Sequence, residues 1–359
     1  MKILYLITGL GMGGAEKVVT NLADNMYELG HEVIIVFMVG NPKVLPKNNI
    51  KIINLSFKKN PLKAFFYFLK IVKNFSPNII HSNMYHANLL ARFSRIFYKV
   101  PKLICSSHSD FEGGKIRMLI YRLTNFLVTI STNVSEQAKN KMVSSGYFNE
   151  EDMIVVHNSI DTNIFKFDKN IREKYRECYS LSSQDVCLLA IGRFHPAKDY
   201  ETLIKVVSKL VRKNYNIKLF IAGDGPLKSN ILEKISLYNL ENNIILLGIR
   251  EDVPNLLSMC DIFISTSAWE GFGLVLAEAM SSSRLVLASR NSGFIEVLGA
   301  NSKFLVNVGD VDGFTAKIEY LINLDNKRKL ELEDDNRQRI CNEFAVSSII
   351  NEWLKLYER

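Results

Sequence analysis

The chain has 359 residues, of which 47% are hydrophobic and 23% charged, a balance ordinary for a soluble globular protein and a length that predicts two domains. Its five cysteines form no C-x-x-C pair, which argues against a disulfide framework or a structural zinc site and fits a reducing cytoplasm. Residues 1–165 hold 19 Lys and Arg against 11 Asp and Glu and so carry the whole net charge of +8, which predicts anionic partners such as phosphates or lipid headgroups.

The apolar start, MKILYLITGL, is interpreted as a strand and not as a signal peptide. Its apolar run is short and leads into a glycine turn without a cleavage site. No apolar stretch approaches the roughly 20 residues that a membrane span needs. We therefore expect a cytoplasmic protein, located at the inner face of the cytoplasmic membrane.

Short β-branched runs alternate with helical segments along the chain. Twelve runs predict strands: ILYLI, EVIIVFMV, IKIINL, NIIHS, KLICSS, LVTIS and MIVVHN, then VCLLAIG, IKLFIAG, NIILLG, DIFIST and RLVLAS. Strands that are apolar on both faces and separated by helices predict parallel sheets covered by helices. The expected fold class is α/β, with two doubly wound, Rossmann-like domains.

The periodicity breaks in HNSIDTNIFKFDKN, near residues 166–170. We therefore expect an N-terminal domain over residues 1–165 and a C-terminal domain over residues 166–340. The amphipathic segment AVSSIINEWLKLYER ends the chain. Residues 341–359 are expected to form a C-terminal helix that crosses back to the N-terminal domain.

The first glycine-rich segment is TGLGMGGAEK, Thr8 to Lys17, and its glycines match G-x-G-x-x-G. A dinucleotide site also needs an acidic residue at the end of the second strand. Glu32 lies at the other, amino-terminal end of that strand, which disfavours an NAD enzyme. Two interpretations remain: a helix N-terminus that approaches another anion, or a tight turn without a ligand.

The segment SAWEGFGLVLAEAM follows a predicted strand and begins a helix. Glu270 is expected in the loop and Glu278 in the second helical turn. The backbone N–H groups of Gly273, Leu274 and Val275 are expected to be free at the helix N-terminus, where parallel sheets bind ligands. Donors for a diphosphate flanked by two carboxylates for hydroxyl groups indicate a nucleotide-sugar site. The alternative is that both glutamates are solvated.

Two cations, Arg193 and Lys198, precede a helix in AIGRFHPAKDYETLI. Cations are unfavourable near a helix N-terminus, so a bound anion would explain them, although ordinary surface charges are the alternative. The segment DVD, Asp310 to Asp312, matches the D-x-D metal motif, but a helix N-cap explains it better. No metal site is expected.

Together these segments resemble the retaining, nucleotide-sugar-dependent glycosyltransferases of family 4, which have the GT-B fold of two Rossmann-like domains with a cleft between them. The matching residues occur in family order over nearly the whole chain. They are GGAE from Gly13, His108 in CSSHSD, HNSID from His157, Arg193 and Lys198, AGDGP from Ala222, and Glu270 to Glu278 followed by AM. The chain departs from the family in SSSRLVLAS and in SGFIEV, near the donor sugar.

The resemblance implies roles for individual residues. Glu270 and His108 would be the catalytic pair, Glu270 beside the anomeric centre and His108 at the sugar. Arg193 and Lys198 would hold the donor diphosphate, and Glu278 the ribose. The full donor-binding set would be Gly13, Gly14, Arg193, Lys198, Ile249, Arg250, Phe272, Gly273, Leu274, Val275 and Glu278, with Ile249 and Arg250 flanking the base and Gly14 approaching the phosphates.

The expected reaction transfers a hexose or N-acetylhexosamine from a nucleotide-diphosphate sugar, UDP-linked, with retention and without a metal or cofactor. The expected acceptor is a polyprenyl-diphosphate-linked oligosaccharide in the synthesis of a surface polysaccharide such as O-antigen or capsule. A GT-B-fold sugar-nucleotide epimerase and a non-catalytic sugar-nucleotide binding module are the alternatives. No nucleic-acid partner is expected.

The basic excess is concentrated in FKKNPLKAFFYFLKIVKNF, Phe57 to Phe75, where Leu62, Phe65, Phe66, Leu69 and Val72 would form one apolar helix face. Such a helix either packs on the domain's sheet or lies on a membrane surface. RFSRIFYKVPK and GGKIRMLIYRL add further basic and aromatic residues. The sequence therefore predicts peripheral contact of the N-terminal domain with an anionic membrane.

Overall fold

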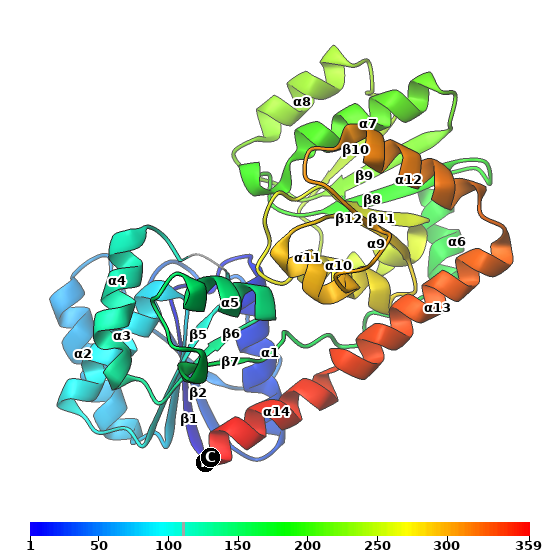
Figure 1. The fold of residues 1–359 in the computed structure, drawn as a ribbon. Helices are drawn as coiled ribbons and strands as arrows, with labels where there is room; N and C mark the ends of the chain where they lie inside the picture. The colour runs from blue at the N-terminus through cyan, green and yellow to red at the C-terminus, as the bar shows by residue number, and fades with distance from the viewer. Residues whose placement is uncertain (110–111) are drawn as a thin grey trace. The chain divides into compact units, whose positions relative to one another are not determined.

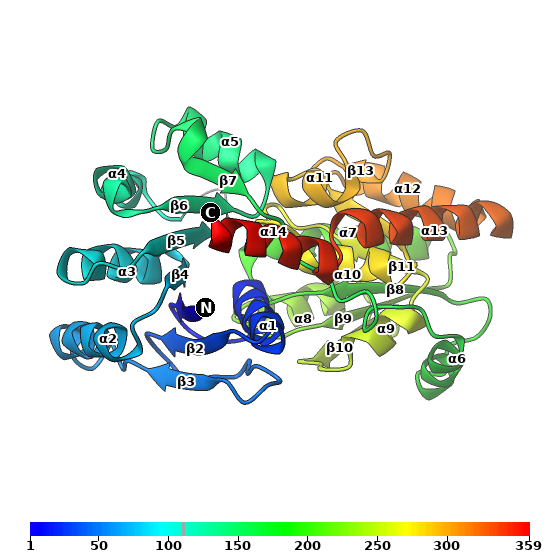
Figure 2. The same cartoon turned by 90° about the horizontal axis from the view of Figure 1, so that it is seen from below.

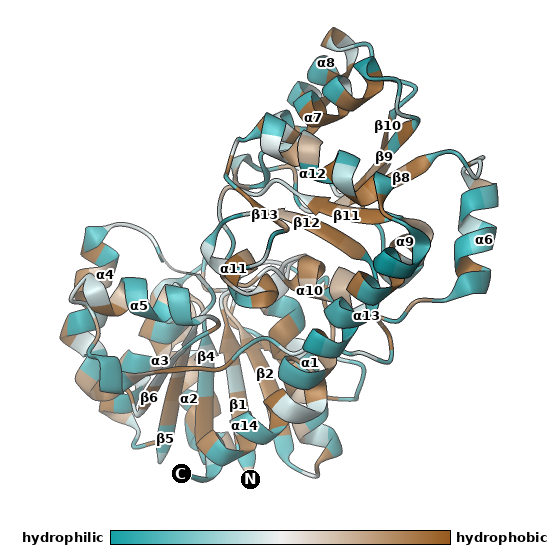
Figure 3. Cartoon of the chain, turned by 45° about the vertical axis from the view of Figure 1, so that its right-hand side comes forward, coloured by the Kyte–Doolittle hydropathy of each residue, from teal (hydrophilic) through white to brown (hydrophobic). Residues whose placement is uncertain are grey.

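A computed structural model describes residues 1–109 and 112–359. The chain forms two compact units: unit 1 comprises Met1–Ser159 and Ile349–Arg359, and unit 2 comprises Ile160–Ser348. Each unit is built on a parallel sheet (Figure 1). In Figure 3 the strands of both sheets are largely apolar in colour, in agreement with strands covered by helices on both faces.

The sheet of unit 1 has seven parallel strands in the order β3-β2-β1-β4-β5-β6-β7. Its strands are β1 Lys2–Ile7, β2 Glu32–Phe37, β3 Lys51–Asn54, β4 Ile79–Asn83, β5 Lys102–Ser107, β6 Ile130–Asn133 and β7 Met153–Val155. All seven strands expected in the first half of the sequence are confirmed.

Helices cover both faces of this sheet. Those of unit 1 are α1 Gly14–Glu28, α2 Pro61–Phe75, α3 Tyr85–Phe97, α4 Lys115–Thr124 and α5 Glu136–Ser144, with short 3-10 turns η1 Asn125–Leu127 and η2 Glu150–Asp152. Helices α2 and α3 pack on alternate residues of the central strands, including Leu4 and Leu6. In α2 the buried residues include Phe68 and Leu69, whereas Leu62 and Phe66 are exposed. The single apolar face expected for α2 is therefore wrong: apolar side chains lie on two faces.

The end of the chain packs within unit 1. Helix α14 Val346–Glu358 places Trp353 and Tyr357 on the buried imidazole of His81, with ring centroids 4.6 and 5.9 Å away. The ammonium of Lys102 donates to the carbonyls of Leu356 and Tyr357, at 3.0 and 2.7 Å. A cation at these carbonyls satisfies acceptors that a helix end leaves open.

The sheet of unit 2 has six parallel strands in the order β10-β9-β8-β11-β12-β13. They are β8 Val186–Ile191, β9 Ile217–Ala222, β10 Ile244–Gly248, β11 Ile262–Ser265, β12 Leu285–Ser289 and β13 Leu305–Val306. The first five confirm the sequence prediction. Strand β13 was missed because two residues carry no periodicity.

Helices also cover both faces of the second sheet. They are α6 Lys169–Cys178, α7 Tyr200–Arg212, α8 Lys228–Leu237, α9 Val253–Met259, α10 Leu274–Ser281, α11 Ser292–Leu298, α12 Val311–Asn323 and α13 Asn326–Glu343, with a 3-10 turn η3 Pro196–Lys198. Helices α7, α8 and α12 lie on one face, and α9, α10 and α13 on the other (Figure 1). Asp310 caps α12 by accepting from the N–H of Gly313 at 2.8 Å, which confirms the N-cap interpretation of the DVD segment. In the described part of the chain, no helix is both long and apolar enough to cross a membrane.

The strand orders locate one switch point in each sheet. In unit 1 the order in which successive strands are added to the sheet reverses between β1 and β4, and in unit 2 it reverses between β8 and β11. Doubly wound sheets bind ligands at the carboxyl ends of the strands at such a point. The relevant loops are those after β1 and β4 in unit 1, and those after β8 and β11 in unit 2.

Candidate active site

The loops after β8 and β11 are joined by hydrogen bonds at the switch point of unit 2. The hydroxyl of Thr266 donates to the carbonyls of Lys198 and Asp199, at 3.1 and 2.9 Å. The N–H of Ala268 donates to the carbonyl of Ala197 at 2.8 Å. These three bonds hold turn η3, which carries Lys198, against the residues that follow β11.

Two residues predicted for the site meet here. The ammonium of Lys198 donates to the carboxylate of Glu270, and the two side chains are only 21% and 18% exposed. A mostly buried ion pair is less screened than a surface pair. Each charge satisfies the other, so any anion that binds Lys198 must compete with Glu270.

Arg193 lies in the same loop after β8 and its side chain is exposed. Among the described residues we find no hydrogen bond or ion pair of its guanidinium. Hydrogen bonds on either side hold its backbone in place. The N–H of Gly192 donates to the carbonyl of Ala222 at the end of β9, and the N–H of Phe194 donates to the carbonyl of Asp224, both at 3.0 Å. Arg193 is thus a cation on a fixed backbone at the switch point.

The AGDGP segment supports that loop through glycine. A Cβ on Gly223 would lie 2.0 Å from the carbonyl oxygen of Gly192, and one on Gly225 would lie 2.6 Å from that of Phe194. Both glycines also have positive φ. Only glycine therefore allows the loops after β8 and β9 to approach this closely.

Helix α10 begins at the same edge of the sheet with an uncapped N-terminus. Gly273 precedes it with φ of 94° and no side chain caps the first turn, so the N–H groups of Leu274 and Val275 are available to a ligand. A Cβ on Gly273 would meet the ring of Phe294 at 2.6 Å. The side chain of Phe272 is buried against Phe344, with ring centroids 5.4 Å apart, so a ligand could reach Phe272 only through its backbone.

The segment SGFIEV, in which the chain departs from the family pattern, retains one glycine that shapes the site. A Cβ on Gly293 would lie 2.8 Å from the backbone of Phe272 and 2.9 Å from the carbonyl oxygen of Glu270. Asn291 caps α11 and its amide donates to the carbonyl of Ser267 at 2.8 Å. The loop that carries Glu270 thus rests directly on the start of α11.

The remaining predicted donor residues of unit 2 differ in environment. Glu278 is buried in α10 at 6% exposure, in the second turn as predicted. Ile249 is 57% exposed just after β10. Arg250 instead makes a bidentate pair with Asp252, at 2.7 and 2.6 Å, and this guanidinium lowers the pKa of Asp252 to about 2. The charge of Arg250 is therefore already neutralised by Asp252.

In unit 1 the loop after β1 leads to the N-terminus of α1. Gly13 precedes the helix in an extended conformation, and no side chain caps the first turn. The carboxylate of Glu16 folds back over Gly13, where a Cβ would lie 2.3 Å from it. Gly14 is exposed. The two glycines leave the backbone at the switch point of this sheet accessible.

His108 follows β5 at the same edge of unit 1. Its Nε2 lies 2.9 Å from the side-chain oxygen of Asn83, so Nε2 donates and Nδ1 is left as an acceptor. Burial lowers the pKa of His108 to about 4, which keeps the ring neutral at pH 7. Asp110, the last residue of CSSHSD, lies outside the described residues.

A small cavity lies beside His108 at the carboxyl ends of β4 to β7. Its lining combines polar residues, among them Asn83, His108 and His157, with apolar residues such as Val134 and Trp353. Beneath it runs a buried hydrogen-bonded chain, with steps of 2.6–2.9 Å, from Tyr5 through Tyr357, His81 and Ser106 to Thr132. Burial lowers the pKa of His81 to about 3. The neutral ring thus links α14 to the cavity wall.

Sequence reasoning missed Thr266, Gly293 and Asn83, which position Lys198, Glu270 and His108 respectively. Thr266 and Asn83 were detectable in part, because both are polar residues at strand ends. Gly293 gave no signal, because its role depends on a contact between loops that are distant in sequence. No cluster of three or more potential metal ligands occurs among the described residues.

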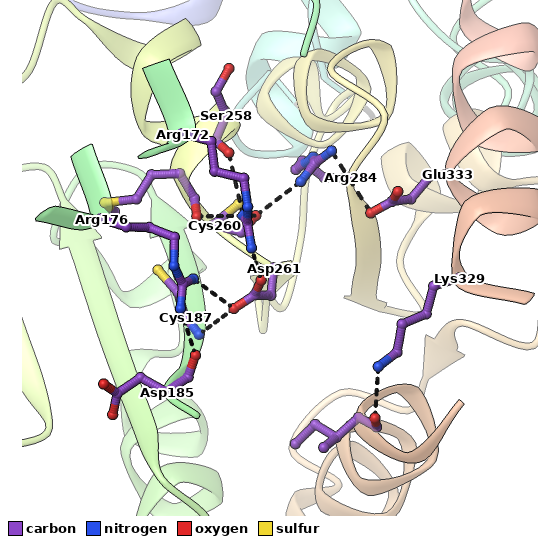
Figure 4. Close-up of polar contacts among 12 residues, drawn as sticks. Arg172, Arg176, Asp185, Cys187, Ser258, Cys260, Asp261, Arg284, Lys329 and Glu333 are labelled. Atoms are coloured by element: carbon purple, nitrogen blue, oxygen red, sulfur yellow. Dashed lines mark hydrogen bonds and ion pairs between the residues drawn. The ribbon is translucent and has the colours of Figure 1, made fainter. Parts of the chain in front are cut away.

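A second cavity, of about 680 Å³, lies at the opposite, amino-terminal edge of the unit 2 sheet. Asp261 accepts from Arg172, from Arg176 at 3.1 Å and from the N–H of Cys187 at 2.8 Å (Figure 4). Arg284 pairs with Glu333 at 3.8 Å. Each of the three arginines thus has a carboxylate partner, with Asp261 shared by Arg172 and Arg176, and the cluster ties α6 to the sheet.

Two family profiles match the chain. The profile described as "Glycosyltransferase Family 4" matches residues 12–164, and that described as "Glycosyl transferases group 1" matches residues 171–338. The chain belongs to this glycosyltransferase family. In this glycosyltransferase the matched residues include the loops after β4, β8 and β11, together with Met12 and Gly13 at the end of the loop after β1.

Relatives and solved structures extend the comparison over the whole glycosyltransferase. It is 23% identical to the N-acetyl-α-D-glucosaminyl L-malate synthase of Bacillus anthracis, over 96% of this chain and 94% of that one. It is 24% identical to the UDP-Gal:α-D-GlcNAc-diphosphoundecaprenol α-1,3-galactosyltransferase of Escherichia coli, over 85% and 81%. The Anabaena protein HepE, crystallised with UDP, superimposes with a TM-score of 0.87 at 18% identity over all of both chains. The fold is GT-B.

Proposed function

We propose that this glycosyltransferase moves a hexose or N-acetylhexosamine, with retention, from a UDP-sugar to a polyprenyl-diphosphate-linked glycan during surface-polysaccharide synthesis. The observation that carries the proposal is the Lys198–Glu270 pair at the switch point of unit 2, beside the exposed cation of Arg193. Cations together with a carboxylate at this position fit a ligand that joins a diphosphate to a sugar.

The donor diphosphate would occupy the space between Arg193, Lys198 and the N-terminus of α10. The two cations and the free N–H groups of Leu274 and Val275 complement a diphosphate without help from a divalent ion. The HepE structure with UDP supports a uridine nucleotide at this fold. Binding of the diphosphate would draw Lys198 away from Glu270 and release the carboxylate toward the sugar.

The carboxylates would divide the remaining donor contacts. Glu270, in the loop, would contact the sugar beside the anomeric carbon and stabilise positive charge that develops there. Glu278, in the second turn of α10, would accept hydrogen bonds from the ribose hydroxyls. Ile249, exposed after β10, would lie against the base. Contacts of Gly13, Gly14 and His108 with the substrates stay predictions.

Retention would follow from departure and attack on the same face of the sugar. The bond between the anomeric carbon and the diphosphate oxygen breaks, and UDP leaves with the electron pair. The acceptor hydroxyl forms the new bond to that carbon, and its proton passes to the departing phosphate oxygen. Arg193, Lys198 and the α10 N-terminus stabilise the charge on the leaving group. No metal takes part.

The acceptor assignment rests on the name of the Escherichia coli relative, which acts on a diphosphoundecaprenol-linked sugar, and on the basic charge of residues 1–165. A lipid-linked acceptor would bring the enzyme to the inner face of the cytoplasmic membrane. The Bacillus anthracis relative is named for a small acid acceptor. Malate is therefore the matched alternative acceptor in the assay.

A titration and a product analysis test the proposal. Isothermal titration in EDTA should show saturable binding of UDP, weaker binding of GDP and ADP, and a large loss in Lys198→Ala but none in Lys205→Ala, a matched lysine in a surface pair with Glu201. Incubation with a UDP-sugar and a diphospho-polyprenyl sugar should give a product whose anomeric proton coupling equals that of the donor. An inverted anomer would refute retention.

The same assay separates the two alternative functions. An epimerase would convert the donor sugar without any acceptor. A binding module would bind UDP and yield neither transfer nor slow donor hydrolysis. Glycosyl transfer that is lost in EDTA would contradict metal independence and leave the rest of the proposal intact.

A further inference from the structure

The second cavity lies within unit 2 at the amino-terminal edge of the sheet, whereas the loops of the proposed donor site leave the carboxyl edge. Its volume is about 680 Å³, and its walls come from α6, the starts of β8, β11 and β12, the end of α12 and the first turns of α13. Figure 2 shows α6 and α13 at one end of unit 2, on either side of β8. Small-molecule sites have volumes of roughly 300–1,000 Å³, so the cavity is large enough for such a ligand.

One part of the cavity wall is apolar. Leu321 and Ile322 belong to the last turn of α12, Leu330 lies in α13, and Phe167 precedes α6. Leu330 is 65% exposed and Phe167 is 38% exposed. A ligand with an apolar body would remove these side chains from water, which favours its binding.

The charged part of the wall holds more cations than carboxylates. Its charged residues are Arg172, Arg176, Arg284, Lys329, Asp185, Asp261 and Glu333. Arg172 and Arg176 share Asp261. The carboxylate of Asp185 accepts from the N–H and the hydroxyl of Ser182, at 2.7 Å each, and so is engaged in its own turn. Among the described residues of the wall, Glu333 is therefore the one carboxylate left for Arg284 and Lys329.

Glu333 neutralises these two cations incompletely. Its carboxylate lies 3.8 Å from Nη2 of Arg284, beyond hydrogen-bonding distance, and burial raises its pKa. Within the described chain, Nη2 of Arg284 makes no hydrogen bond, although its Nε and Nη1 donate to backbone carbonyls at 3.1 and 3.2 Å. The ammonium of Lys329 donates to the carbonyl of Ile322 at 2.8 Å, a neutral acceptor. Figure 4 shows Glu333 and Lys329 on the side of the cluster away from Arg176.

Arg284 is the buried cation of this wall. It is 4% exposed, and the ring of Phe167 lies 4.2 Å from its guanidinium carbon. It belongs to SSSRLVLAS, a segment in which the chain departs from the family pattern, and it precedes β12 at the edge of the sheet away from the donor-site loops. A buried guanidinium needs full compensation of its charge and its donors. An anion in the cavity would supply both.

We propose that the second cavity is a ligand site for a small organic molecule that has one anionic group, a phosphate or a carboxylate, and an apolar body. The anionic group contacts Arg284 and Lys329, and the apolar body lies on Leu330 and Phe167. The bound molecule holds α6 and α13 on the sheet and stabilises the protein by mass action. The inference does not rest on the proposed function, because no residue of the proposed donor set lines the cavity.

Ligand-observed fluorine NMR with the full chain tests the site. The probes are para-trifluoromethylphenyl phosphate and para-trifluoromethylbenzoate, which distinguish a phosphate from a carboxylate, and para-trifluoromethylbenzyl alcohol is the neutral control. At least one anion should bind saturably at millimolar concentrations and raise the melting temperature, and the alcohol should bind at least about tenfold more weakly. Equal binding of the alcohol, or no binding of either anion, would overturn the proposal.

Two nearly isosteric variants should have opposite effects on anion binding. Lys329→Gln should weaken it at least about threefold, because a cation of the site is lost. Glu333→Gln should strengthen it at least about threefold, because a competing negative charge is removed. Lys327→Gln, which replaces an exposed lysine of α13 outside the lining, should leave it unchanged. Weaker binding in Glu333→Gln, with the alcohol bound as in the wild type, would contradict the assigned contacts.

Saturating UDP distinguishes this site from the proposed diphosphate site, which could also take a phosphate. The anion should stay bound in the presence of UDP, because the two sites lie at opposite edges of the sheet. Displacement of the anion by UDP would place the probe in the donor site and overturn the second site. Protein that binds the anion but not UDP would refute the proposed function and leave the second site standing.

Discussion

The ammonium of Lys198 contacts the carboxylate of Glu270 across two loops that follow neighbouring parallel strands, β8 and β11. The residues are 72 positions apart in sequence. Their pairing neutralises the charges of these two side chains. A diphosphate would exchange one anionic partner of Lys198 for another, which couples donor binding to the release of Glu270.

That coupling predicts different defects for the two partners. Glu270→Gln should lower transfer by about 100-fold or more with little change in UDP affinity, because its charge is needed at the developing cation. Lys198→Ala should weaken UDP binding about tenfold or more. Initial rates and titration calorimetry measure these effects. Full transfer activity in Glu270→Gln would remove Glu270 from the mechanism.

Arg193 should contribute to donor binding by charge. Arg193→Ala is expected to weaken UDP affinity by about tenfold, because a charge-assisted hydrogen bond to phosphate is lost. Uridine, which has no phosphate, should bind equally to both proteins. Arg212→Ala, which removes an exposed arginine on α7, serves as the control. Equal losses for UDP and uridine would contradict a phosphate contact.

Gly273→Ala should destabilise the protein through two effects. The residue has φ of 94° and its new Cβ would lie 2.6 Å from Phe294, so we expect a loss of about 2–4 kcal/mol in unfolding free energy. Gly40→Ala isolates the backbone effect, because Gly40 has φ of 86° and no atom within 4 Å of the Cβ. It should cost only about 1 kcal/mol. Urea unfolding measures both, and equal losses would exclude the Phe294 contact as a cause.

Acid should destabilise the fold through buried histidines. The folded pKa values of His81 and His108 lie at about 3 and 4, below the ordinary 6.5. Their stabilising contribution is complete above pH 6.5 and is lost as the pH falls toward those values, by about 1.4 kcal/mol per unit for each ring. Urea unfolding between pH 7 and pH 5 measures the slope.

Glu112 opposes this trend, because burial raises its folded pKa to about 7 from 4.5. Its contribution is complete below pH 4.5 and is lost as the pH rises toward 7. Glu112→Gln removes this opposition, so the variant should lose stability on acidification more steeply than the wild type, by about 1.4 kcal/mol per unit. Parallel slopes would show that Glu112 has an ordinary pKa.

Asp261 should be a stability residue without a role in donor binding. It satisfies Arg172, Arg176 and the N–H of Cys187, so Asp261→Asn is expected to cost about 2–3 kcal/mol by leaving two guanidinium groups undercompensated. Asp312→Asn, from an exposed pair with Lys209, should cost less than about 1 kcal/mol. Thermal and urea unfolding compare them. A change in UDP affinity in Asp261→Asn would contradict the structural role.

The sequence by itself determined most of the strands and the family to which the chain belongs. Twelve of the strands are readable from apolar runs, because burial on both faces of a parallel strand leaves a continuous signal. The site segments were readable too, since glycine, cations and carboxylates at strand ends are unusual together. Strand β13 was not, because pairing between two residues leaves no pattern.

Only the tertiary structure decided which of these groups meet. The Lys198–Glu270 pair and the support of Gly293 beneath Glu270 depend on which strands become neighbours and how their loops pack. The exposed apolar face of α2 likewise could not be separated from its buried face by periodicity, because both faces are apolar. Local pattern reports what a residue prefers, whereas strand order and packing determine what it contacts.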